Sequence, residues 1–417
     1  MEAAEQPMDD FAELRRFRKR CLLFSVPLGA VILPALLILA ASGECFTDMD
    51  DIIRRSEREE FLIGFAYNEG NYGYLKYRRL LSLPKQSVVA LGSSRVLGFR
   101  EDMFTGPFYN AGFTIVSPWD FRSFLQQIPD DKLPDVLIAG LDQFMFNAEN
   151  NESRPPKPVT AWTTFHPDDL QTALKLLPDV YKNLARGRID VGRVLTAALG
   201  DTSTGHAKPI GLNGLLNSQG FRNDGSMVYG GQVKLLLDGD SSARDFGFSD
   251  TLNRIRRGRN RFNWCGEPDS AALEEIDRFL QECAERKVFV TAFLPPYADA
   301  VWNEMQQSGN FEYLTEIETR LRGIFEHHGF ELYSFHRMAD CDASDQEAID
   351  GFHAGENVYA RMLIRMADPG SALSRYVSIP QLNADLENVV DRYTLYPESG
   401  RQSSRLAAAP DEFRPTR

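Results

Sequence analysis

The chain has 417 residues, enough for one large α/β domain with insertions or for two or three average domains. Its composition is typical of a globular protein, because 43% of the residues are hydrophobic and can build a substantial core. The formal net charge of −13 argues against non-specific binding to nucleic acid, which requires a basic surface.

Residues 21–43 form an uncharged apolar run near the N-terminus. A helix needs about 20 apolar residues to cross the hydrocarbon layer of a membrane, so this run is long enough. Its two prolines, Pro27 and Pro34, are tolerated better in a membrane helix than in a soluble one. A cleaved signal peptide is the alternative, but its apolar region is typically about 7–15 residues long. The longer run favours a retained transmembrane anchor.

Charged residues on the two sides of this run predict its orientation. Basic side chains precede it and acidic side chains follow it: Arg15, Arg16, Arg18, Lys19 and Arg20, then Glu44, Asp48, Asp50 and Asp51. Because basic residues are enriched on the cytoplasmic side of membrane helices, residues 1–20 are expected to be a cytoplasmic tail. We therefore predict a single-pass protein of the inner (plasma) membrane whose main domain is periplasmic or extracellular.

Strand and helix patterns alternate after the apolar run. Residues 44–84 are predicted to form a juxtamembrane stalk that packs onto the following domain. Short apolar runs then predict buried strands at 87–91, 108–113, 135–141, 288–294 and 330–335, and helical patterns lie at 119–128, 271–286, 313–328 and 355–366. This alternation predicts an α/β domain, residues 85–375, with a parallel sheet covered on both faces by helices.

The alternation stops between about residues 143 and 265. This segment holds two helical patterns, 167–185 and 191–199, followed by a polar, glycine-rich stretch. So long an interval within an α/β domain predicts an insertion that serves as a lid or docking surface. Residues 376–417 turn polar and are expected to be a partly disordered tail.

Polar residues that follow the predicted strands indicate where chemistry could occur, because ligands bind at the carboxyl ends of open parallel sheets. Ser94 follows the first strand, Gly112 the second, and Asp350 and His353 precede the last helix. A hydroxyl, a turn glycine and a carboxylate–imidazole pair are the parts needed for nucleophilic acyl transfer. Ser94 alone could equally be a turn residue that caps the next helix. The order of all four favours Ser94 as nucleophile, His353 as base and Asp350 as the group that orients it.

These motifs resemble the sequence blocks of the SGNH (GDSL-like) hydrolase superfamily. Gly92-Ser93-Ser94 is similar to the first block, Gly112 matches the oxyanion-hole glycine of the second, and Asp350-x-x-His353 matches the last. The third block departs from the pattern, because Asp142 stands where the family has its oxyanion-hole Asn. An ionised Asp142 would repel a developing oxyanion, and Gln143 is the alternative donor, one residue out of register.

The resemblance covers roughly residues 87–367 without the insertion, and it implies a three-layer α/β/α fold. With the N-terminal anchor, the chain looks like the branch that includes lipoteichoic-acid D-alanylation proteins and alginate and peptidoglycan O-acetylation proteins. This implies a serine acyltransferase or esterase that acts on a cell-envelope polysaccharide or glycolipid, beside a membrane-bound O-acyltransferase partner. A non-catalytic SGNH-like scaffold that binds envelope polymer or a membrane partner is the alternative, and the altered third block supports it.

A dense basic run stands out in the otherwise acidic domain: Arg254, Arg256, Arg257, Arg259 and Arg261. It can be a solvated helix face, or a site for phosphate-bearing headgroups or anionic polymer through bidentate contacts. No metal or cofactor is expected. The five cysteines lack zinc-site spacing, and residues 92–98 lack the glycine spacing of a dinucleotide fingerprint.

Overall fold

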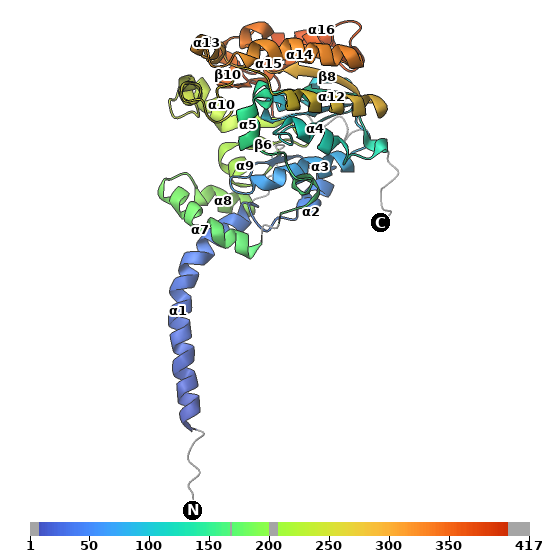
Figure 1. Ribbon diagram of the computed structural model, residues 1–417. Coiled ribbons are helices and arrows are strands. Elements are labelled where there is room, and N and C mark those ends of the chain that lie inside the picture. Colours follow the sequence, from blue (N-terminus) through green and yellow to red (C-terminus); the bar gives the residue numbers. More distant parts are fainter. Residues whose placement is uncertain (1–7, 167–168, 200–206, 399–417) are drawn as a thin grey trace, which may run out of the picture.

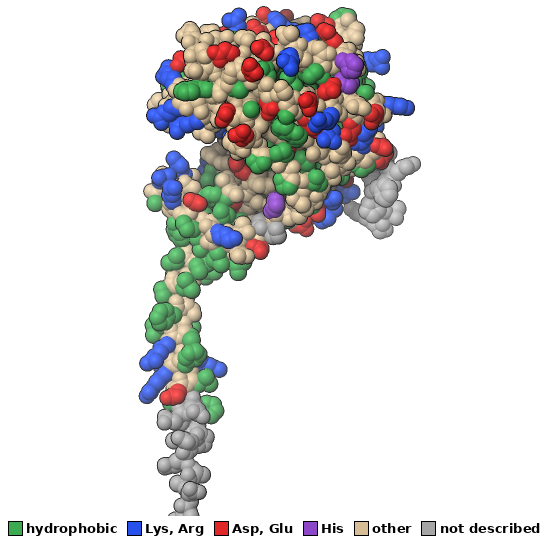
Figure 2. Space-filling model, in the orientation of Figure 1, with side chains coloured by type: hydrophobic (Ala, Val, Ile, Leu, Met, Phe, Trp, Pro, Cys, Tyr) green, Lys and Arg blue, Asp and Glu red, His purple; other side chains and the backbone are tan. Residues whose placement is uncertain are grey.

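The computed structural model describes residues 8–166, 169–199 and 207–398. A long helix, α1 (Met8–Ala41), extends away from a globular body that holds the other elements (Figure 1). Among the described residues, α1 is the one helix long and apolar enough to cross a membrane. Figure 2 shows hydrophobic side chains along its length and a cluster of basic side chains near its N-terminal end.

A five-stranded sheet forms the centre of the body, in the order β3 (Phe108–Asn110), β2 (Val88–Leu91), β4 (Val136–Gly140), β8 (Phe289–Leu294) and β9 (Glu331–Ser334). Every neighbouring pair is parallel. The strands β2, β3 and β4 are buried along their whole length, as their continuous apolar runs require in a sheet covered on both faces. The predicted mixed α/β fold with a parallel sheet is confirmed.

The helices predicted around this sheet are also present, with ends that differ by a few residues from the predicted ones. They are α4 (Pro118–Leu125), α12 (Ser270–Glu285), α14 (Tyr313–His328) and α15 (Glu356–Met366). α4 packs on α12 through Phe121 and Phe279, whose ring centroids are 5.3 Å apart. α15 packs through Tyr359 against Phe99, with centroids 5.0 Å apart. β3 is shorter than predicted because the Asn110 side chain accepts the N–H of Gly112 and turns the chain.

A second, smaller sheet joins the predicted stalk to the insertion, a relationship that the sequence did not predict. Its order is β5 (Lys208–Ile210), β1 (Phe61–Ile63), β6 (Gln219–Phe221) and β7 (Met227–Tyr229). Within 44–84, α2 (Met49–Arg55), β1 and α3 (Tyr72–Ser82) pack with these strands around a shared apolar cluster. Residues 44–84 are thus built into the body of the protein.

The helix α1 is fastened to the body where it ends. The Glu44 carboxylate is fully buried and accepts backbone N–H groups of residues 66–68 and of Leu212. Two helices of the insertion, α7 (Leu170–Ala185) and α8 (Val191–Leu199), pack beside the C-terminal half of α1. They agree with the helices expected at 167–185 and 191–199, although residues 167 and 168 lie outside the described ones.

The remaining elements complete the insertion and the C-terminal part. They are α5 (Ala148–Ser153), α6 (Thr160–Thr163), α9 (Leu212–Asn217), α10 (Gly230–Leu237), α11 (Ser249–Arg256), α13 (Asp299–Ser308), the antiparallel pair β10 (Ala348–Asp350) and β11 (His353–Ala354), and α16 (Ile379–Glu387). In the predicted tail, α16 is followed by Leu395 and Tyr396, which are buried. Residues 399–417 lie outside the described part of the chain.

Candidate active site

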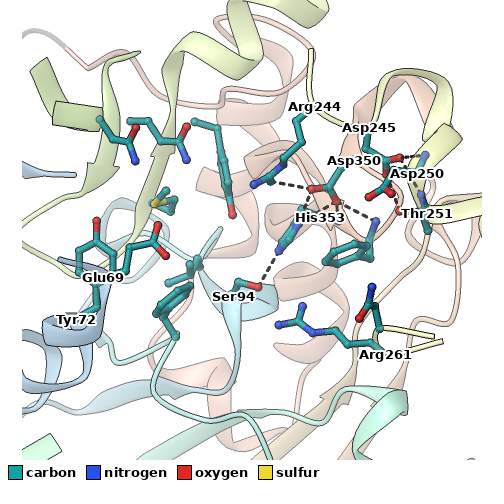
Figure 3. Close-up of a pocket in the computed structure, with 18 of the residues that line it drawn as sticks. Glu69, Tyr72, Ser94, Arg244, Asp245, Asp250, Thr251, Arg261, Asp350 and His353 are labelled. Carbon is teal, nitrogen blue, oxygen red and sulfur yellow. Dashed lines mark hydrogen bonds and ion pairs between the residues drawn. The ribbon is translucent and has the colours of Figure 1, made fainter. Parts of the chain in front are cut away.

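A cavity of about 370 Å³ lies beside the carboxyl end of β2, between the central sheet and the insertion (Figure 3). Ser94, Asp350 and His353 line it together with side chains from the insertion and from the segment before α3. The cavity therefore lies at the carboxyl end of β2, the strand at which the strand order reverses, where an open parallel sheet is expected to bind ligands.

Ser94 begins a single 3₁₀ turn, η2 (Ser94–Val96), directly after β2. The Ser93 hydroxyl caps this turn by accepting the backbone N–H of Arg95 at 3.1 Å. Val96 fits against Gly140 at the end of β4, where a Cβ would lie only 2.3 Å from Val96 Cγ1. The close approach that glycine permits at this position fixes the turn over the end of the sheet. Ser94 is partly buried and lines the cavity.

The structure brings Ser94, His353 and Asp350 together in a line. His353 Nε2 lies 2.8 Å from Ser94 Oγ, and His353 Nδ1 lies 2.8 Å from both carboxylate oxygens of Asp350. Asp350 and His353 face each other across the β10–β11 pair. A carboxylate at Nδ1 keeps the imidazole proton on that nitrogen, so that Nε2 can accept the Ser94 proton. This is the hydrogen-bonding chain of a nucleophile, a base and an orienting acid.

The Asp350 carboxylate is almost completely buried and has several partners. Arg244 Nη2 donates to it at 2.9 Å, and the backbone N–H groups of Phe352 and His353 donate at 3.1 and 2.9 Å. Burial alone would raise the pKa of Asp350, but His353, Arg244 and the Phe352 N–H favour the ionised form and lower the pKa below its usual range. Asp350 is therefore an anion at neutral pH.

The two predicted oxyanion-hole donors have other partners in the structure. The Gly112 N–H donates to Asn110 Oδ1 at 2.9 Å. Gln143 is fully buried: its Nε2 donates to the Pro295 carbonyl at 2.8 Å, and its Oε1 accepts from Arg95 at 2.9 Å. Neither residue lines the cavity. The structure thus places Gln143 as a support for Arg95, with its amide directed to the Pro295 carbonyl instead of the cavity.

Asp142 forms an ion pair with Arg95, a residue whose role the sequence did not reveal. Arg95 Nη1 lies 3.3 Å from Asp142 Oδ1, and both side chains are about 1% exposed. Arg95 also donates to the Phe352 carbonyl at 3.0 Å and to the Pro295 carbonyl at 2.8 Å. The predicted repulsion between Asp142 and an oxyanion therefore does not arise, because the Asp142 carboxylate is buried behind the turn and paired with a cation.

The five arginines of the basic run at 254–261 fall into two groups in the structure. Arg254 and Arg261 line the cavity, whereas Arg256, Arg257 and Arg259 are exposed away from it. Arg256 pairs with Glu304 at 2.6 Å. Sequence analysis missed other side chains that line the cavity, because they come from segments without a recognisable motif: Glu69, Tyr72, Arg154, Tyr229 and Arg244.

Within the described ranges, no group of three or more His, Cys, Asp or Glu side chains is arranged to hold a metal ion. No protein-family model matches the chain, and none of the curated proteins is significantly similar to it in sequence. What this site does must therefore be inferred from its own geometry.

Proposed function

We propose that this protein is a membrane-anchored serine acyltransferase or esterase of the SGNH type, acting outside the cytoplasm on a cell-envelope polysaccharide or glycolipid. The observation that carries the proposal is the unbroken chain of contacts from Ser94 through His353 to Asp350 beside an open cavity. These residues are 259 and 3 positions apart along the chain, and only tertiary structure brings the hydroxyl and the imidazole together.

In the proposed reaction, Ser94 Oγ attacks the carbonyl carbon of an acyl ester while its proton moves to His353 Nε2. The backbone N–H of Ser94 stabilises the oxyanion. When the ester C–O bond breaks, His353 returns the proton to the departing alkoxide, leaving an acyl group on Ser94. Water, or a hydroxyl of the glycan, then gives its proton to His353 and attacks the acyl carbon. The bond between Ser94 Oγ and the acyl group breaks, and His353 returns the proton to Ser94 Oγ, which releases the acid or the acylated glycan. Asp350 stays ionised and stabilises the imidazolium in both halves.

The anchor supports the proposed location. α1 carries apolar side chains over its outer surface, and its basic residues lie at the end remote from the body. Under the positive-inside rule, this arrangement supports an extracytoplasmic position for the cavity. A membrane-bound O-acyltransferase is the proposed partner, because the described chain has one helix suited to crossing a membrane and a transported acyl group needs a multi-span carrier.

The proposal is tested by labelling the full-length protein in detergent with a fluorophosphonate and locating the adduct by mass spectrometry. We expect modification of Ser94 in the wild type and none in Ser94→Ala or His353→Ala. Asp350→Asn should react about 10⁴-fold more slowly, because the imidazole loses its tautomeric control. Ser93→Ala is the matched control and keeps its reactivity, since Ser93 Oγ only caps the turn.

A non-catalytic scaffold is the second candidate, and the hydrogen bonds that occupy Gly112 and Gln143 favour it. A wild-type protein that resists the probe, yet co-purifies with a membrane acyltransferase, would establish this second function. Comparing envelope glycans by mass spectrometry, with and without the protein, then identifies the acyl group and its acceptor.

A further inference from the structure

Two arginines in the cavity, Arg154 and Arg261, have no carboxylate partner in the described chain. The other two arginines of the lining are paired: Arg244 with Asp350 at 2.9 Å, and Arg254 with Asp250. Arg261 Nε is buried without any hydrogen-bond partner. Both side chains are partly buried. Cations that are taken out of water are normally paired with carboxylates, whereas these two guanidinium groups are not.

The surroundings of the two side chains disfavour their charge. Burial lowers the pKa of Arg154, and the nearby cation of Arg254 lowers it further. Burial also lowers the pKa of Arg261, and the nearby cation of Arg154 lowers it further. Repulsion between like charges in a partly desolvated site raises the free energy of the protein. A bound anion would neutralise the charges and lower it.

The position of Arg261 is fixed relative to the catalytic chain. Its guanidinium carbon lies 5.0 Å from the ring centroid of Phe144 and 5.8 Å from that of Phe352, the residue directly before His353. Figure 3 shows Glu69 and Tyr72 on one side of Ser94 and Arg261 on the other. Glu69 would repel an anion on its own side. The carboxylates on the Arg261 side already have partners: Asp250 pairs with Arg254, and Asp245 accepts the Thr251 hydroxyl and the Gly351 N–H.

We propose that Arg154 and Arg261 form a subsite for an anionic group of the substrate, a carboxylate or a phosphate, held beside the ester that reacts at Ser94. The planar guanidinium fork matches either anion through paired hydrogen bonds. The inference rests on the proposed function for the position of the ester, but binding of the anion requires no catalysis. It restricts the acceptor to a uronate-containing or phosphate-containing envelope polymer or glycolipid.

The test measures binding by calorimetry in full-length protein carrying Ser94→Ala, so that no turnover occurs. The probes are trigalacturonate for a carboxylate source, glycerol phosphate for a phosphate source, and maltotriose as the neutral comparison. We expect at least one anionic probe to bind more tightly than maltotriose, with affinity falling as salt rises. The anion that binds identifies the source.

Variants then assign the binding to the subsite. Arg154→Gln and Arg261→Gln should each weaken anion binding about 10- to 100-fold, the loss expected for hydrogen bonds to a charged group. Arg259→Gln, in the same basic run but exposed outside the cavity, removes the same charge and should leave affinity unchanged. Arg154→Gln alone decides the matter if Arg261→Gln fails to fold, because Arg261 also contacts two aromatic rings.

The subsite is refuted if neither anion binds more tightly than maltotriose, or if Arg259→Gln weakens binding as much as Arg154→Gln does. Its failure is distinguishable from failure of the proposed function. If the protein binds an anion but does not react with fluorophosphonate, the proposed subsite is supported and the proposed enzymatic function is refuted. If Ser94 reacts with fluorophosphonate but no anion binds, the proposed enzymatic function is supported and the proposed subsite is refuted.

Discussion

Arg95 and Asp142 form an ion pair that is buried beneath the candidate active site, with 3.3 Å between Nη1 and Oδ1. The pair joins three parts of the site. Arg95 directly follows the nucleophile, and Asp142 lies two residues after the end of β4. Arg95 Nε also donates to the carbonyl of Phe352, which lies between Asp350 and His353 in the sequence. One guanidinium thus sets the distance between the Ser94 turn and the His353 loop.

Removing the two members of this pair should have unequal effects on stability. Arg95→Met leaves the Asp142 carboxylate buried, and neither of its oxygens has a hydrogen-bond partner, so we expect a loss of about 3–5 kcal/mol. Asp142→Asn should cost less, because Arg95 keeps three oxygen acceptors. Adding Asp142→Asn to Arg95→Met should recover part of the loss. Denaturant unfolding of the four proteins measures these differences, and equal losses in the two single variants would contradict this account.

The same pair predicts a separate effect on activity. Arg95→Lys keeps the charge but cannot reach Phe352, Pro295 and Gln143 together, so the His353 loop should shift and kcat should fall more than KM rises. Asp142→Asn introduces the residue found in the SGNH pattern that the sequence resembles. It should not raise the rate of ester hydrolysis, because position 142 does not line the cavity. A clear gain in rate for Asp142→Asn would show that this side chain reaches the oxyanion after all.

Lys76 provides a test of the structure through the pH dependence of stability. It is buried, donates to the Asn110 carbonyl at 3.1 Å and to the Gly225 carbonyl, and lies 3.9 Å from the ring centroid of Phe221. Burial lowers its pKa to about 7, against about 10.4 in an unfolded chain. Between these values the unfolded state binds more protons than the folded state. Lys76 should therefore add stability as pH rises through this interval, by up to about 1.4 kcal/mol per pH unit.

The measurement compares wild type with Lys76→Met from pH 6 to pH 9, so that the titration of other groups cancels. The stability difference in favour of the wild type should be constant below about pH 7 and should increase above it. A difference that stays flat up to pH 9 would mean that the ammonium remains charged in the folded protein. Lys85→Met, at an exposed lysine that pairs with Asp135, is the matched control and should show no such increase.

The sequence predicted those parts of the structure whose signal is local. Residues 136–140 and 289–294 are apolar runs bounded by turn residues, and they became the strands β4 and β8. The order of Ser94, Asp350 and His353 also indicated a site whose geometry the structure shows. These signals work because buried strands and catalytic loops place strict demands on residue type within a few positions.

The parts that the sequence did not predict depend on partners far apart in the chain. The small sheet has strands of three residues, too short to show a period. Asn223, just after β6, fixes the start of the inner strand β1: its amide donates to the Ser56 and Glu59 carbonyls and accepts the Phe61 N–H, more than 160 residues away. Likewise, Asp142 departs from the pattern that the sequence resembles, and the sequence alone gives Arg95 no role. Only the structure shows that these two side chains form an ion pair.

The contact between α7 and α1 predicts how deeply the insertion enters the membrane. Tyr181 of α7 donates its hydroxyl to the backbone carbonyl of Val31. Val31 lies ten residues before Ala41, which corresponds to about 15 Å along a helix. If residues 21–43 span a hydrocarbon layer of about 30 Å, this contact lies near its midplane. The exposed apolar side chains of α7 and α8, such as Leu174 and Leu195, should then face lipid.

Quenching of tryptophan fluorescence by brominated lipids tests this depth in full-length protein reconstituted in bilayers. We expect Leu174→Trp and Leu195→Trp to add emission that brominated chains quench strongly. Val390→Trp is the control, because Val390 is 53% exposed but lies next to α16, on the part of the body remote from α1 (Figure 1). If the two tryptophans in the insertion were quenched no more than the control, α7 and α8 would lie above the bilayer. In that case the membrane-spanning part of the chain would have to begin nearer the N-terminus than residue 21.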